Sequence, residues 1–267
     1  MSWIWGTLMP HPPIIVPDVG RGREREAAVT LDGLNELMKR LKGLAMPDRI
    51  LLLSPHQSYA LGAYAVNRSA MIRGSLLPFG APSITFDVRT PLTDVDSLTN
   101  FLMSADVPVS LVESHDLTHD QGSLVPLYFI EGCYESLPGV ILSNPIGLDR
   151  AAAFNLGRAL AHFDDGKRWA LLASGDLSHR LKPSAPAGYS PAGEKLDRTV
   201  IDSLSRGDPL TLLEMPIKAV EDAGECGLRS VLTLLGLVSV LKGPIDVLSY
   251  EGPFGVGYCN ALWANRG

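Results

Sequence analysis

The run RILLL at residues 49–53 is almost entirely apolar and stops at Ser54-Pro55-His56. A short apolar run that ends at a turn is typical of a strand buried on both faces of a sheet. The run WALLA at 169–173 predicts a second such strand. Further strands are expected at 3–9, 63–66, 83–88, 107–112 and 139–143, and two more in IDVLSYEGPFGVGYCNALW around its Gly/Pro turn.

Helical spacing of apolar residues separates these runs. The helices are expected at 24–44, 93–105, 125–134, 150–163, 192–206, 209–215 and 228–242. Strands that alternate with helices predict a layered α/β domain. The sequence contains no repeat and no low-complexity linker, so we expect one domain over residues 1–267.

Composition excludes several classes of function. The formal net charge is −6 and no block of Lys and Arg stands out, which argues against a nucleic-acid partner. The longest apolar stretch, residues 231–241, is too short to cross a bilayer, so no membrane partner is expected. The N-terminus lacks a signal-peptide pattern, and the three cysteines form no CxxC pair, which together predict a cytoplasmic location.

Sequence motifs of several common enzyme classes are absent, namely the nucleophile elbow, the P-loop, HExxH and GxGxxG.

Three of the six histidines share one context. His11, His56 and His179 each lie just beyond an expected strand, and two of them directly follow a proline. Ligands of open α/β sheets bind beyond the carboxyl ends of the strands, so these side chains are candidates for one site. The alternative for each is a structural or surface histidine. His115 and His119 stand four apart, but the surrounding Asp and Gly residues indicate a loop rather than a helical metal pair.

Two histidines and one carboxylate form the ligand set of non-haem Fe(II) centres that bind both substrate and O₂. The segment VEDAGECGLRS offers Glu221, Asp222 and Glu225 just before the last long helix. These acids could instead decorate a helix N-terminus, where negative charge is favourable. The glycines that flank Glu225-Cys226 favour a site, because they allow the backbone to approach closely.

Four ordered segments resemble the class III extradiol ring-cleavage dioxygenases, in their catalytic subunit-B-like form, and the related Memo-like proteins. The segments are MPHPPIIVPDVG, ILLLSPHQ, LLASGDLSH and DAGECGLRS followed by LLG. The resemblance covers nearly the whole chain. It implies a single α/β domain with a central mixed β-sheet flanked by helices, and a metal site beyond the strand ends.

The resemblance also implies roles for particular residues. His11 and His56 match the two histidine ligands. His179 matches the catalytic histidine, with Asp176 beside it, and His119 matches a pocket histidine that assists catalysis.

The third metal ligand is open between Glu225 and Cys226. Dioxygenases of this fold place a glutamate there, and Memo-like proteins a cysteine. Counting back from Gly236 favours Cys226, whereas the preference of Fe(II) for hard ligands favours Glu225, which we take as the expected ligand. Gln121-Gly122 stands where ring-cleaving relatives often carry His-Gly.

The function implied by the resemblance is Fe(II)-dependent extradiol ring cleavage of a catechol- or aminophenol-type aromatic with O₂. His179 would take a hydroxyl proton and later return it, a role that suits an imidazole near neutral pH. The alternative is a Memo-like metal-binding protein of the same fold without ring cleavage, holding Zn(II) or another divalent metal. The acidic balance, with Trp3 and Trp5 taken as exposed, would suggest a homodimer or a small partner subunit, but we favour a core position for both tryptophans.

Overall fold

In the computed structural model, which describes residues 2–265, the chain is built on an eight-stranded sheet in the order β6-β3-β7-β2-β8-β1-β10-β9. The strands are β1 (Trp3–Met9), β2 (Arg49–Leu53), β3 (Tyr64–Asn67), β6 (Val109–Val112), β7 (Gly139–Asn144), β8 (Trp169–Ser174), β9 (Ile245–Glu251) and β10 (Tyr258–Ala264). The central strands β7, β2, β8 and β1 are parallel to one another. Strand β10 pairs antiparallel with β1 and β9, and β3 pairs antiparallel with β7 but parallel with β6. The expected mixed sheet is confirmed.

The apolar run 49–53 explains why the sheet is covered on both sides. Leu51 and Leu53 point into the core on one face, and Ile50 and Leu52 point into the core on the other. All four side chains are fully buried. Successive side chains of a strand point to opposite faces, so four consecutive apolar residues require a covering layer on each side of the sheet.

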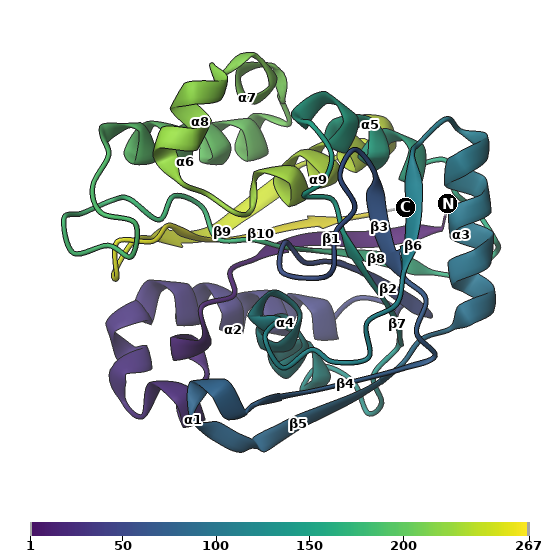
Figure 1. The fold of residues 1–267 in the computed structure, drawn as a ribbon, viewed down its shortest axis with the longest axis horizontal. Helices are drawn as coiled ribbons and strands as arrows, with labels where there is room; N and C mark the ends of the chain where they lie inside the picture. Colours follow the sequence, from purple (N-terminus) through teal and green to yellow (C-terminus); the bar gives the residue numbers. More distant parts are fainter. Residues whose placement is uncertain (1, 266–267) are drawn as a thin grey trace.

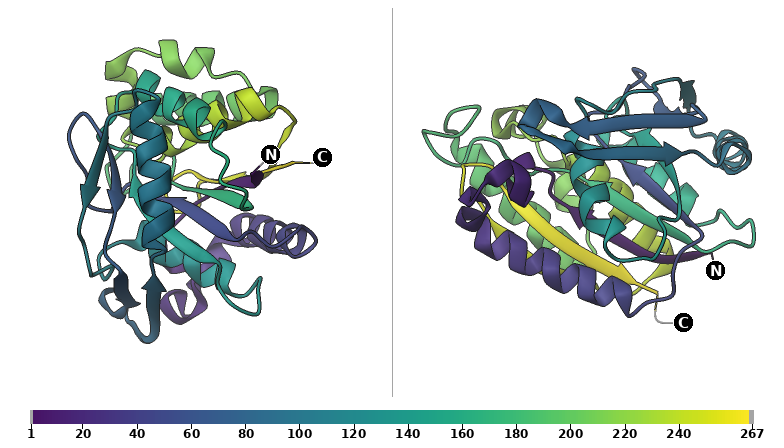
Figure 2. Two further views of the ribbon diagram at one scale, coloured as in Figure 1. Left: turned by 90° about the vertical axis from the view of Figure 1, so that its right-hand side faces the viewer. Right: turned by 90° about the horizontal axis from the view of Figure 1, so that it is seen from below.

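Helices supply these two layers, as Figures 1 and 2 show. The α-helices of the described residues are α1 (Pro17–Gly20), α2 (Ala28–Lys42), α3 (Leu92–Ser104), α4 (Gln121–Glu131), α5 (Arg150–Leu160), α6 (Pro191–Arg206), α7 (Leu210–Glu214), α8 (Ile217–Ala223) and α9 (Leu228–Leu241). Helices α5 to α9 lie above the sheet in Figure 1, and α2 and α4 lie below it. Within residues 2–265, no helix is both long and apolar enough to span a membrane.

Helices α5 and α9 pack with their backbones in close contact. A Cβ atom on Gly157 would lie 1.9 Å from the carbonyl oxygen of Thr233, and one on Gly236 would lie 2.1 Å from that of Phe154. Glycine at both positions therefore permits the contact. This packing fixes α9 over the sheet, with its N-terminus at the strand ends.

The structure differs from the sequence-based expectation in a two-stranded sheet and in one helix. The strand expected at 83–88 is part of β5 (Ala81–Arg89), which pairs with the unpredicted β4 (Met71–Leu76) in a separate two-stranded sheet. Helix α8 was also not expected. Trp3 and Trp5 are fully buried, one in each core, which is the position that we expected for both. A homodimer or a small partner subunit stays a prediction.

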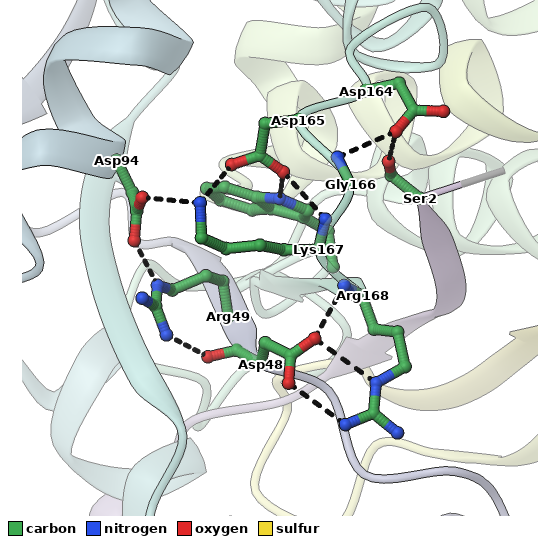
Figure 3. Close-up of polar contacts among 10 residues, drawn as sticks. Ser2, Asp48, Arg49, Asp94, Asp164, Asp165, Gly166, Lys167 and Arg168 are labelled. Atoms are coloured by element: carbon green, nitrogen blue, oxygen red, sulfur yellow. Dashed lines mark hydrogen bonds and ion pairs between the residues drawn. The ribbon is translucent and has the colours of Figure 1, made fainter.

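Ion pairs connect the amino ends of the central strands (Figure 3). Asp94 on α3 contacts Arg49 at the start of β2, and it lies 3.0 Å from Lys167, just before β8. Arg168 pairs with Asp48 at 3.0 Å. Because these charges are paired with one another, this edge of the sheet has a structural role. The opposite edge, where the parallel strands end, carries the histidines.

Candidate metal centre

Three side chains from distant parts of the sequence converge beyond the strand ends. Nε2 of His11 lies 3.1 Å from Nε2 of His56 and 3.6 Å from Sγ of Cys226. All three atoms lie within 4.8 Å of one another. Two nitrogens and a sulfur bound to one tetrahedral ion at about 2.0 and 2.3 Å would be about 3.3 to 3.6 Å apart. The donor atoms are therefore spaced as ligands of a single metal ion.

The end of β8 holds His11 in place. The backbone N–H of His11 donates to Oδ1 of Asp176 at 2.8 Å, and its Nδ1 lies 2.9 Å from the hydroxyl of Ser174. That contact fixes the ring so that Nε2 faces the other two donors, as an outer hydrogen bond does for metal-bound histidines. Burial, together with nearby His56, lowers the pKa of His11 well below its usual value. The imidazole is therefore neutral and has a lone pair available for a metal.

The loop that carries His56 is attached to α4. The Ser54 hydroxyl accepts the backbone N–H of His56 at 3.2 Å and donates to Oδ1 of Asp120 at 2.5 Å. Asp120 also accepts from the Gln57 side chain and caps α4 at the N–H of Ser123. The sequence analysis did not identify Asp120, although an Asp three residues before a Ser at a helix start is a capping signal. His56 itself is exposed and forms the open side of the cluster.

Two glycines bring Cys226 to the cluster. A Cβ atom on Gly175 would lie 2.3 Å from Cα of Gly227, and the N–H of Gly227 donates to the carbonyl oxygen of Asp176 at 2.9 Å. The turn before α9 therefore lies directly against the end of β8. Burial, with nearby Asp176 and Glu225, raises the pKa of the Cys226 thiol well above its usual value. A bound divalent cation would oppose these effects and favour the thiolate.

Glu225 does not join the cluster, contrary to our expectation that it is the third ligand. Its Oε2 accepts the N–H of Leu228 at 2.6 Å, and its Oε1 pairs with Nη1 of Arg229 at 2.9 Å. The carboxylate lines a cavity of about 600 Å³ between α5, α8 and α9, together with Arg150 and Val220. The free N–H groups at the start of α9 and the Arg229 guanidinium attract the carboxylate away from the histidines. Cys226 is the donor that faces them.

His179 and Asp176 lie beside the cluster, as the sequence suggests. Nε2 of His179 is 3.7 Å from Sγ of Cys226, and its backbone N–H donates to the carbonyl of Gly224 at 2.9 Å. Burial lowers the pKa of His179, while nearby Asp176 opposes that shift. Burial raises the pKa of Asp176 to about 6. His179 is not one of the three clustered donors.

His119 is exposed in the loop before α4, one residue from Asp120. Within residues 2–265, no hydrogen bond joins the His119 side chain to the clustered residues. Its assignment to the pocket stays a prediction.

Comparison with known proteins identifies the family. Residues 6–260 match the family described as the catalytic LigB subunit of aromatic ring-opening dioxygenase. The chain belongs to this family. The match confirms the resemblance found in the sequence, and it supports metal binding and a dioxygenase type of fold in general terms.

Two relatives extend this comparison. Protein CA_C1420 of Clostridium acetobutylicum is 34% identical over 263 residues, which cover 94% of this chain and 55% of the relative. The chain thus spans about half the length of that curated protein. The crystal structure of uncharacterized protein JW3007 from Escherichia coli K12 matches with a TM-score of 0.62 at 17% identity, covering 97% of this chain and 99% of that one. This second likeness shows the shared fold.

Proposed function

We propose that the protein is a metal-dependent extradiol dioxygenase whose metal is held by His11, His56 and Cys226. The observation that carries the proposal is the convergence of these three donor atoms at one point. The exposed position of His56 leaves one side of the cluster open to a small ligand. A catechol- or aminophenol-type aromatic, which chelates a metal through two adjacent groups, is the proposed substrate, with O₂ as co-substrate.

A bound Fe(II) would supply Lewis acidity and an O₂-binding position. The proposed roles of the protein groups are proton transfer and orientation. His179 reaches the cluster from the turn after β8, with Nε2 beside Cys226, where it would accept a hydroxyl proton from the substrate and later return it. Asp176 lies close enough to favour the protonated imidazole electrostatically. Ser174 keeps Nδ1 of His11 engaged and its Nε2 directed at the centre.

Anaerobic reconstitution with Fe(II), followed by exposure to O₂ and a panel of catechols and aminophenols, tests this function. The expected result is a ring-cleavage chromophore with at least one substrate. His179→Ala should keep its iron and lose turnover by about 10²–10⁴-fold, the usual effect of removing a proton-transfer group. Iron bound in full without any chromophore would refute ring cleavage, and iron lost from His179→Ala would make His179 a ligand.

Cys226 favours a second candidate function, a metal-binding protein of the Memo-like type without ring cleavage. Non-haem Fe(II) oxygenases use a carboxylate as third ligand, whereas a thiolate with imidazoles suits Zn(II) or copper. Metal analysis of protein purified without added metal separates the two candidates. Zinc or copper that Fe(II) does not replace, together with no ring cleavage, would favour the second.

A further inference from the structure

Asp197 is a buried carboxylate that is not part of the cluster of metal donors. It lies on α6 and is fully buried. Its Oδ1 accepts the backbone N–H of Ser178 at 2.8 Å, and its Oδ2 accepts the hydroxyl of Tyr250 at 2.8 Å. Among the described residues it has no ion-pair partner. Because a buried carboxylate is unfavourable unless its oxygens accept hydrogen bonds, these two contacts hold the side chain in one position.

The contact with Ser178 lies at the centre of the turn that carries His179. Gly257 donates its N–H to the Ser178 carbonyl at 2.8 Å, and the Ser178 hydroxyl donates to the Ala223 carbonyl at 2.7 Å. A Cβ atom on Gly257 would lie 2.0 Å from Oδ2 of Asp197, so glycine leaves room for the carboxylate. The next residue is His179, and among residues 2–265 its ring makes no polar contact other than the 3.7 Å contact with Sγ of Cys226. The orientation of the ring therefore depends on the backbone of this turn.

Buried carboxylates hold the segments of the other functional side chains in the same way. In each case a buried carboxylate accepts hydrogen bonds from the segment that carries one functional side chain. The pairs are Asp176 with the N–H of His11, Asp120 with Ser54 in the loop of His56, and Glu225 with the N–H of Leu228 after Cys226. Asp197 completes this set for His179.

We propose that Asp197 is a positioning residue for His179, acting through the Ser178 N–H. Its role in turnover rests on the proposed function, whereas its effect on the His179 ring does not. Removing the acceptor leaves the Ser178 N–H without its partner and loosens the turn, so that Nε2 of His179 is held less firmly beside Cys226. The metal donors His11, His56 and Cys226 have their own anchors, and we expect them to keep their positions.

Histidine-labelled NMR of the Zn(II)-loaded protein tests the positioning. The imidazole nitrogens of the six histidines are recorded, with His179 assigned from His179→Gln. In Asp197→Ala we expect the His179 signals to shift or broaden, with the His11 and His56 signals and the zinc content unchanged. Asp197→Asn retains an oxygen acceptor for Ser178 and should restore the wild-type signals. Tyr250→Phe, the matched control, removes only the partner of Oδ2 and should leave His179 unchanged.

Kinetics provides the second readout. In protein that cleaves catechols, Asp197→Ala should lower kcat by about 10- to 100-fold, the range expected for a displaced catalytic group, with KM nearly constant. If Asp197→Ala does not fold, Asp197→Glu takes its place, since the longer side chain displaces the acceptor while keeping a carboxyl group. Unchanged His179 signals in the folded variant would overturn the proposal, as would equal changes at all histidines. A wild-type protein without ring cleavage refutes the proposed function only, because the NMR comparison still decides the positioning.

Discussion

Replacing Glu225 by alanine should destabilise the fold without removing the metal. The variant loses the acceptor for the N–H of Leu228, and a lost helix cap destabilises by about 1–2 kcal/mol. It also leaves Arg229 without its carboxylate. The Arg229 side chain is 26% exposed, so this loss is smaller than the ~3–5 kcal/mol of a fully buried pair, about 1–2 kcal/mol. The expected decrease in unfolding free energy is therefore about 2–4 kcal/mol.

Urea unfolding in EDTA measures this decrease, because the chelator removes the contribution of bound metal to stability. Zinc content after reconstitution is measured on the same preparation and should equal that of the wild type. Cys226→Ser is the control with the opposite expectation, a loss of zinc with an unfolding free energy in EDTA within about 1 kcal/mol of the wild type. If Glu225→Ala lost zinc while its stability in EDTA stayed the same, the glutamate would be the ligand and our assignment would be wrong.

Three further predictions concern residues around the site. Gly157→Ala places a Cβ atom 1.9 Å from the Thr233 carbonyl oxygen and should lower the unfolding free energy, measured by urea titration, by about 1–3 kcal/mol. An unchanged urea midpoint would contradict the close packing of α5 on α9. Burial raises the pKa of Asp197 from 3.8 to about 7. Between about pH 4 and 7 the folded state therefore binds one more proton than the unfolded state, and the unfolding free energy should fall as pH rises through this range. Asp197→Asn should flatten that dependence, and an equally steep curve would assign it to another group. Asp120→Ala should weaken zinc affinity by about 10- to 100-fold in chelator competition, because the loop of His56 loses its hydrogen bond from Ser54 to Asp120. Wild-type zinc affinity would show that this hydrogen bond does not position His56.

Sequence patterns predicted those features that depend on strand order and burial. The apolar run 49–53 required layers on both faces, and the structure has them. His11, His56 and His179 were expected together because parallel strands end at one edge of a sheet, and they lie there. The strand β4 was missed because MIRGSL contains an arginine, a glycine and a serine and pairs only with β5, outside the main sheet.

Side-chain direction on a turn could not be predicted in the same way. Glu225 and Cys226 are neighbours in the sequence, so either could face the histidines. In the folded chain the Leu228 N–H and the Arg229 guanidinium bind the two oxygens of Glu225, which leaves Cys226 to face the histidines. Asp120 and Asp197 were missed for a related reason. An aspartate in a sequence resembles a solvated surface acid until the fold shows that it is buried and accepts backbone hydrogen bonds.

The position of β1 has a consequence for how the protein matures. This strand lies between β8 and β10, which follow it in the sequence by more than 150 residues, and His11 just after it is separated from Cys226 by 215 residues. During translation the apolar segment WIWGTLM therefore emerges long before either partner strand exists. Such long-range pairing folds slowly and leaves an unpaired, aggregation-prone strand in the nascent chain, which calls for chaperone protection. The ligand set is complete only after α9 docks, so the three donors cannot bind one metal ion until the chain has been synthesised at least through this helix.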